Sequence, residues 1–164
     1  ARNDRAAVEK LIGEAAALPI DSNERRQIDA EVFALAHRGP AAAALYAYFF
    51  VPTPIDNALL AQWAAIAEPE LGFAHYLLGL QRSVLGLWGP AAEELDRALE
   101  LELPGAQFVR NAARRLAIAG YRSHDAARVG KAIATLSGPG MTTPDRLLAT
   151  DWQERLAFDA KRPR

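Results

Sequence analysis

Prolines and glycines interrupt this chain at short and fairly even intervals, and between them the apolar residues mostly recur at spacings of three and four. That spacing gathers apolar side chains on one face of an α-helix, while proline and glycine end helices. The pattern predicts nine short helices, which begin near residues 4, 22, 40, 56, 69, 90, 106, 124 and 143. Ser22, Asp56 and Thr143 are the predicted N-caps, because such side chains can accept a hydrogen bond from the first turn.

The composition limits the class of protein. A length of 164 residues suits one domain, expected to span 1–164 and to hold a core without disulfides. There is no cysteine, so thiolate metal sites are excluded. A formal net charge of −1 gives no field that would attract nucleic acid. The most apolar stretch, 41–51, is too short to insert across a bilayer and is predicted to be a buried helix.

Residues 71–104 carry the most specific pattern, because small residues fall where two antiparallel helices would have to touch. The positions are Leu78, Gly79, Gly86, Ala91, Leu95, Ala98 and Pro104. This set resembles the small and large residues that characterise a tetratricopeptide-repeat (TPR) hairpin. In that family a large residue and a glycine lie mid-way along the first helix, and alanine opens the second. The resemblance implies an all-α, TPR-like fold and a habit of binding other proteins.

Pairing the predicted helices in order gives about four helical hairpins and a C-terminal capping helix at 143–160. One hairpin hides only part of its apolar surface, so such units stack into an α-solenoid, here a TPR-like superhelix. The clearest repeats are 71–104 and 105–137, since Gly86 and Gly120 are 34 residues apart, which is the tetratricopeptide period. The capping helix would cover the exposed end with Leu147, Leu148, Trp152 and Leu156.

No group of residues predicts catalysis, a metal or a cofactor. The three histidines, His37, His75 and His124, lie on separate predicted helices without a second ligand at metal-binding spacing. No serine lies in a nucleophile elbow, and the loop at 137–140 lacks the lysine of a phosphate loop. Neighbouring acids such as Glu93 and Glu94 point about 100° apart on a helix and cannot act as an acid/base pair. We therefore expect a protein that is not an enzyme.

The charges divide sharply between two neighbouring segments. Residues 91–104 hold five acidic residues and one basic residue, a net charge of −4, whereas 105–137 hold six basic residues and one acidic residue, a net charge of +5. Either the adjacent helices neutralise one another, or the arginines serve an acidic partner. Exposed ion pairs stabilise by only about 0–1 kcal/mol each, so stability alone is a weak reason for the division.

In the family that the hairpin resembles, the first helix of each repeat lines a concave groove. Carried onto this chain, the resemblance implies a partner-binding groove made by Phe73, Tyr76, Leu80, Ser83, Gln107, Arg110 and Arg114. The apolar side chains would bury part of an extended peptide, and the guanidinium groups of Arg110 and Arg114, four residues apart on one face, would bind a carboxylate. The expected partner is another protein or a peptide, for example one with an acidic segment or C-terminus.

Two alternatives to this scaffold function remain open. Tyr46, Tyr48, Phe49 and Phe50 surround their predicted helix almost completely, which indicates either burial on all sides or the interface of a homo-oligomer. The chain would then be an oligomerisation or docking domain of a larger bacterial protein. The other alternative is an all-α enzyme, which would need a closed polar pocket with a buried acid. The abundance of alanine, and of arginine over lysine, indicates a bacterial source but leaves the compartment open between cytoplasmic and exported.

Overall fold

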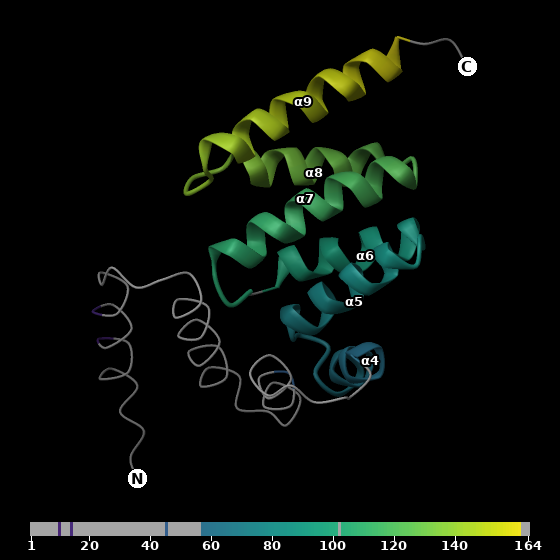
Figure 1. The fold of residues 1–164 in the computed structure, drawn as a ribbon, viewed down its shortest axis with the longest axis vertical. Helices are drawn as coiled ribbons and strands as arrows, with labels where there is room; N and C mark the ends of the chain where they lie inside the picture. Colours follow the sequence, from purple (N-terminus) through teal and green to yellow (C-terminus); the bar gives the residue numbers. More distant parts are fainter. Residues whose placement is uncertain (1–9, 11–13, 15–44, 46–56, 102, 162–164) are drawn as a thin grey trace. The chain divides into compact units, whose positions relative to one another are not determined.

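A computed structural model describes residues 10, 14, 45, 57–101 and 103–161 (Figure 1). The chain divides into two compact units, Ala1–Pro54 and Ile55–Arg164. In the first unit the described residues are Lys10 and Glu14, whose Nζ and Oε1 atoms lie 3.8 Å apart, and the buried Leu45. The helices predicted to begin near residues 4, 22 and 40, and the predicted N-cap Asp56, lie outside the described residues.

The described part of the second unit is all-α, which confirms the predicted class, and it holds no strand. Its helices are α4 (Asn57–Ala67), α5 (Gly72–Val84), α6 (Trp88–Glu100), α7 (Ala106–Arg122), α8 (Ala126–Ser137) and α9 (Thr143–Ala160). Most boundaries fall within a few residues of the prediction. The main differences are that α5 begins at Gly72 rather than near Pro69, that α6 ends at Glu100 rather than near Leu103, and that α7 continues to Arg122 rather than ending at Ala119.

Two helix starts differ from the prediction in a way that affects the rest of the fold. The N-cap of α9 is Thr142 and not Thr143, because the Thr142 hydroxyl accepts the N–H of Asp145 while the Asp145 carboxylate accepts the N–H of Thr142. This reciprocal pair is a capping box. The N-cap of α8 is Asp125, which accepts the backbone N–H of Arg128 at 3.0 Å. The hydrogen bond from that N–H lowers the pKa of the Asp125 carboxyl.

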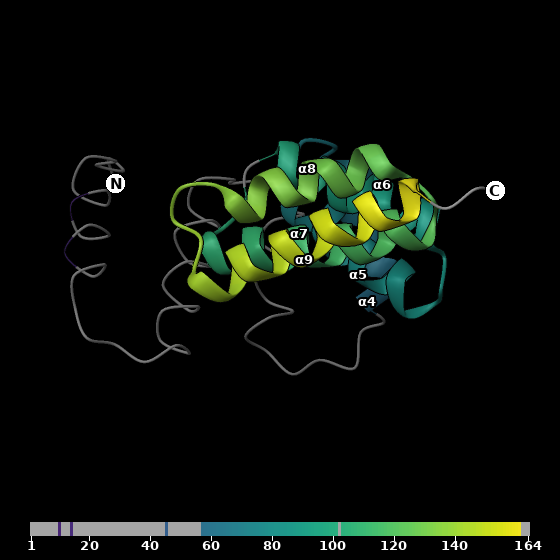
Figure 2. The ribbon, with the colours of Figure 1, turned by 90° about the horizontal axis from the view of Figure 1, so that it is seen from above.

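Each helix packs mainly against its neighbours in sequence, and α5 also contacts α7. Short turns make α5 and α6, and then α7 and α8, antiparallel pairs (Figure 1). In the view from above, α6 and α8 lie on one side of the unit and α5 and α7 on the other (Figure 2). Helices α6 and α8 are separated in the sequence by α7 but contact each other directly, since Lys131 Nζ of α8 lies 2.9 Å from Asp96 Oδ2 of α6. The helices therefore form two layers.

Small residues set how closely the paired helices approach. A Cβ atom added to Gly79 would lie 2.5 Å from the Cγ of Leu95, so glycine is required where α5 meets α6. At Gly120 an added Cβ would lie 3.1 Å from Val129, where α7 meets α8. The helix interfaces are otherwise rich in fully buried alanine, namely Ala91, Ala92, Ala98, Ala112, Ala113, Ala117, Ala119 and Ala132.

The turns show that Gly86 and Gly120 are not equivalent positions. Gly86 has φ +73° in the α5–α6 turn, whereas Gly120 lies inside α7. The residue at the matching place in the α7–α8 turn is His124, with φ +61°. The matching turn positions are thus 38 residues apart, from 86 to 124, because α7 has 17 residues and α5 has 13. The spacing of 34 from Gly86 to Gly120 therefore does not mark a structural repeat.

Helix α9 packs against α8 (Figure 1), and its Trp152 ring lies 5.3 Å, centroid to centroid, from Tyr121 of α7. Trp152 is buried, and Leu148 and Leu156 are half-buried. Leu147 was expected in the same stripe but is 66% exposed, because it points about 100° away from Leu148 on the helix. Among the described helices, none combines the length and the apolar character that a bilayer-spanning segment requires.

Candidate functional site

Three aromatic rings fill the space between α5 and α7. Phe73 and Tyr76 stack with ring centroids 5.8 Å apart, and both meet the edge of Phe108, at 5.1 and 5.7 Å respectively. All three side chains are at least nine-tenths buried. Phe73 and Tyr76, predicted to face a partner, therefore belong to the core that joins the two helices. The sequence reasoning missed Phe108, although it is the next residue after the predicted Gln107.

The other uncharged residues of the predicted groove are also partly or wholly enclosed. Ser83 is buried, and its hydroxyl donates to the Gly79 carbonyl oxygen at 2.7 Å, one turn back along α5. Leu80 and Gln107 are half-buried. Ser83 is therefore buried and hydrogen-bonded within its own helix, whereas Leu80 and Gln107 retain solvent-exposed surface that a partner could contact.

Arg110 and Arg114 face a carboxylate of the chain itself. Arg114 donates from Nε and Nη2 to Asp145 Oδ1, at 2.9 and 2.6 Å, and Arg110 Nε lies 3.9 Å from Asp145 Oδ2. Asp145 is fully buried in the first turn of α9, while the Arg114 side chain is 45% exposed. The two arginines thus do lie on one face and do bind a carboxylate, but the acid comes from 31 residues further along the chain.

The environment of Asp145 keeps it ionised. Burial alone would raise the pKa of this carboxyl, but the hydrogen bonds from Thr142 and Arg114 outweigh burial and hold the pKa below its usual value. The sequence signal was present, since Thr142 and Asp145 have the spacing of a capping box. The ion pair between Asp145 and Arg114 of α7 could not be predicted from the residues around Asp145, because Arg114 is 31 residues away in the sequence.

The charge division between the segments is explained in part by contacts between α6 and α8, which lie in the same layer. Asp96 on α6 accepts hydrogen bonds from Arg128 Nε at 3.2 Å and from Lys131 Nζ at 2.9 Å, both on α8. Lys131 also lies 3.2 Å from Glu100. The hydrogen bonds to Asp96 and Glu100 raise the pKa of Lys131. For the basic residues of α8, the adjacent helices do neutralise one another.

The basic residues of α7 that face solvent are a different case. Arg115 and Arg122 are exposed, and neither forms an ion pair with another described residue. Arg122 lies over the ring of Trp88, with its Cζ atom 5.4 Å from the ring centroid. Burial raises the pKa of Tyr76 while the charge of Arg115 acts against that rise, which places Arg115 near α5. Ile118, between the two arginines on the helix surface, is 38% exposed.

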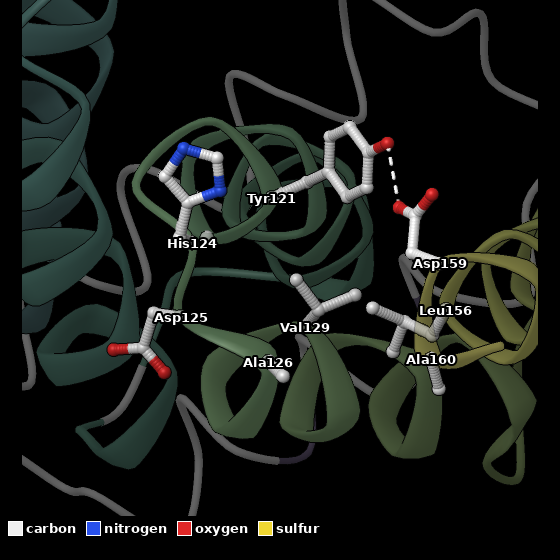
Figure 3. Close-up of a pocket in the computed structure, with 9 residues that line it drawn as sticks. Tyr121, His124, Asp125, Ala126, Val129, Leu156, Asp159 and Ala160 are labelled. Atoms are coloured by element: carbon white, nitrogen blue, oxygen red, sulfur yellow. Dashed lines mark hydrogen bonds between the residues drawn. The ribbon is translucent and has the colours of Figure 1, made fainter. Parts of the chain in front are cut away.

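At one end of the stack the helices leave a wedge-shaped pocket of about 720 Å³ (Figure 3). It lies between the last turn of α7, the first turn of α8 and the end of α9, and we call it the α7–α9 wedge. Leu156, Ala126 and Ala160 supply the accessible apolar surface, whereas Val129 is fully buried beneath it. The hydroxyl of Tyr121 donates to Asp159 Oδ2 at 2.8 Å across the opening (Figure 3). The full lining is Gly120, Tyr121, His124, Asp125, Ala126, Val129, Leu156, Asp159 and Ala160.

The remaining predicted residues give no further site. Within the described range, no three His, Asp or Glu side chains are close enough together to hold a metal ion. His75 contacts Glu94 Oε2 at 2.6 Å and the Pro69 carbonyl oxygen at 2.9 Å, so it joins α5 to α6. The predicted oligomer interface, Tyr46, Tyr48, Phe49 and Phe50, lies outside the described residues.

Comparison with known proteins adds no assignment. The chain matches no protein family, no curated protein and no solved structure. Its function must therefore be argued from its own side chains.

Proposed function

We propose that this chain is a non-catalytic scaffold, a TPR-like α-solenoid that holds a peptide or a domain of another protein along α5 and α7. The order of the helices supports the solenoid: α5 and α7 share one layer, α6 and α8 share the other, and α9 covers the end. Stacked helix pairs of this kind present a long continuous face to a partner. The unequal lengths of α5 and α7 give the two hairpins different turn positions.

The exposed face of α7 is the observation that carries the proposal. Arg115 and Arg122 flank Ile118 there, and Val84 at the end of α5 is 84% exposed. Arginine beside exposed apolar side chains is the composition that protein interfaces favour, since the apolar atoms gain from burial and the guanidinium group fixes the orientation. An acidic, partly apolar segment would satisfy both.

In this proposal the acidic group of the partner contacts Arg115 of α7, in place of the Arg110 and Arg114 that the sequence predicted. Arg110 and Arg114 already share the carboxylate of Asp145, so a second carboxylate would have to compete with a buried one. Arg115 has no such competitor among the described residues. Leu80 and Gln107 keep their predicted place beside the partner, while Phe73 and Tyr76 act by holding α5 against α7.

The test is affinity capture from a lysate of the source organism with three forms of the chain. We compare the wild type with Arg115→Glu and with the control Arg146→Glu, which makes the same charge change at an exposed position of α9. A protein retained by the wild type and by Arg146→Glu, but lost with Arg115→Glu, supports the scaffold function and places the partner on α7. Circular dichroism confirms that all three forms are helical.

Two outcomes count against the proposal. If Arg115→Glu retains the same partner as the wild type, the α5–α7 face is not the binding surface. If the folded wild type retains nothing at any salt concentration, the scaffold function itself loses its support. Low-salt capture is included because exposed ion pairs weaken as salt rises.

A further inference from the structure

The α7–α9 wedge combines an apolar floor with a carboxylate whose charge is not neutralised. Among the described residues Asp159 forms no ion pair, and it accepts a hydrogen bond from the hydroxyl of Tyr121 alone. A carboxylate has room for about four hydrogen bonds, so most of its capacity remains available. Leu156 and Ala160 lie beside it in the same pocket and provide the accessible apolar surface.

The charged groups around the wedge leave Asp159 as the acceptor. Asp125 is held by Arg128, whose Nη1 lies 2.7 Å from Asp125 Oδ2, and it points away from Asp159 (Figure 3). Arg155, one turn before Asp159, rests with its Cζ atom 5.6 Å from the ring centroid of Tyr121 and 5.1 Å from that of Trp152. His124 and Lys161 are exposed and form no ion pair with described residues.

We propose that the wedge receives a lysine side chain carried by the partner protein. The methylene stem would lie along Leu156, Ala126 and Ala160, as lysine stems commonly do on apolar surface, and the ammonium group would reach Asp159. One oxygen of Asp159 already accepts from Tyr121. The arrangement therefore suits the single compact ammonium group of lysine better than the two-point fork of arginine.

The pocket has the size that such an occupant needs. A volume of about 720 Å³ lies inside the range typical of ligand sites, roughly 300–1,000 Å³, and exceeds the volume of one side chain. The partner's backbone would therefore lie over the opening, next to the exposed His124. This inference rests on the proposed function only in assigning the lysine to a partner protein, because the pocket is on the α9 side of α7 and Arg115 is on the α5 side.

The experiment is a ¹⁵N–¹H correlation NMR titration with small probes in place of the partner. The probes are Nα-acetyl-lysine methylamide, Nα-acetyl-norleucine methylamide, which has a four-carbon stem without the charge, and Nα-acetyl-arginine methylamide. We expect saturable shifts for Gly120, Ala126 and Ala160 with a millimolar dissociation constant for the lysine probe. The norleucine probe should bind about two- to five-fold more weakly, the ratio set by one exposed ion pair.

Matched variants separate a specific site from a general negative field. Asp159→Asn removes the charge but keeps an oxygen that accepts from Tyr121, so it should weaken the lysine probe about two- to five-fold. Asp151→Asn makes the same change two turns earlier on α9 and should leave the dissociation constant unchanged. The NMR spectra themselves report whether each variant is folded.

Three results would overturn the inference: no saturable shift at the lining residues up to about 50 mM probe, equal affinity for lysine and norleucine, or equal weakening by Asp151→Asn. Tighter binding of the arginine probe would overturn the choice of lysine. None of these results depends on Arg115, so a failure here and a failure of the α5–α7 capture experiment are distinguishable.

Discussion

The carboxylate of Asp145 should be the most consequential charge in the second unit. Replacing it with alanine removes the acceptor for Thr142 and the partner of Arg114. The Thr142 hydroxyl still caps the backbone N–H of residue 145, but it loses the Asp145 carboxylate as its own acceptor, which costs about 1 kcal/mol. Loss of an ion pair with a half-exposed arginine costs about 0.5–1 kcal/mol after screening by solvent. The unpaired Thr142 N–H adds about 1 kcal/mol. We therefore expect α9 to lose about 2–3 kcal/mol of stability against local opening.

Native-state amide hydrogen exchange measures this loss in α9 directly. A decrease of about 2–3 kcal/mol corresponds to roughly 30- to 140-fold faster exchange of the α9 amides, because every 1.4 kcal/mol is a factor of ten. Asp145→Asn keeps a capping oxygen but loses the charge, so its effect should be smaller. Asp151→Ala, an exposed position on the same helix, should change the free energy by less than about 0.5 kcal/mol. If Asp145→Ala and Asp151→Ala accelerate exchange equally, the capping box and the pair with Arg114 carry no net stability.

The pH dependence gives an independent check on Asp145. Its pKa is lowered in the folded state, so its contribution to stability is complete above the unfolded pKa, about 3.9, and is lost as the pH falls through the folded pKa. Thermal melting at pH 7, 5, 4 and 3 should show destabilisation of the wild type mainly below about pH 4. Asp145→Asn should show a smaller decrease over that range, and an equal decrease in both would mean that Asp145 does not titrate as argued.

Four further substitutions test the packing and the ion pairs. Gly79→Ala should destabilise the protein by about 1–3 kcal/mol in urea unfolding, because the added Cβ would clash with Leu95. Gly130→Ala is the matched control: it has open space in α8 and should stabilise the protein by about 0.5–1 kcal/mol. A Gly79→Ala variant as stable as the wild type would show that the close approach of α5 and α6 is unnecessary. Phe108→Ala should cost about 3–5 kcal/mol by the same assay, and a cost below about 1 kcal/mol would contradict its place in the core. Asp96→Ala should accelerate exchange in α8, since Arg128 and Lys131 lose their shared acceptor, and unchanged exchange would mean that these ion pairs contribute nothing.

Local signals in the sequence predicted much of the described fold. The spacing of apolar residues and the prolines placed α4 to α9 within a few residues, and Gly79 with Leu95 marked the contact between α5 and α6. These features are local, or involve residues on either side of one tight turn. The register of the second hairpin was wrong because a glycine of the right spacing, Gly120, serves in α7 as a close-packing residue and not in the turn.

The candidate site was less accessible to prediction, since it depends on which residues meet across the fold. The sequence showed that Arg110 and Arg114 share a helix face. It did not show that both would pair with the carboxylate of Asp145, which is 31 residues after Arg114 in the chain. Exposure was also hard to judge, because a shift of one residue along a helix separates the half-buried Gln107 from the buried Phe108. The α7–α9 wedge is lined by residues from three separate segments, so no pattern within one segment could have predicted the pocket.

Helix α7 separates charges of opposite sign, and this constrains any partner that spans it. On the α5 side Arg115 stands near Tyr76, while on the α9 side Tyr121 donates to Asp159. Arg110 and Arg114 also lie on the α9 side of α7, where the Asp145 carboxylate neutralises them, so they do not offset the negative charge of Asp159. A segment that crosses from α5 to α9 would therefore place its acid first and its lysine second, and the reversed segment would bring like charges together at both ends. Under the two proposals, the same division of charge would therefore also set the direction in which a partner segment crosses α7.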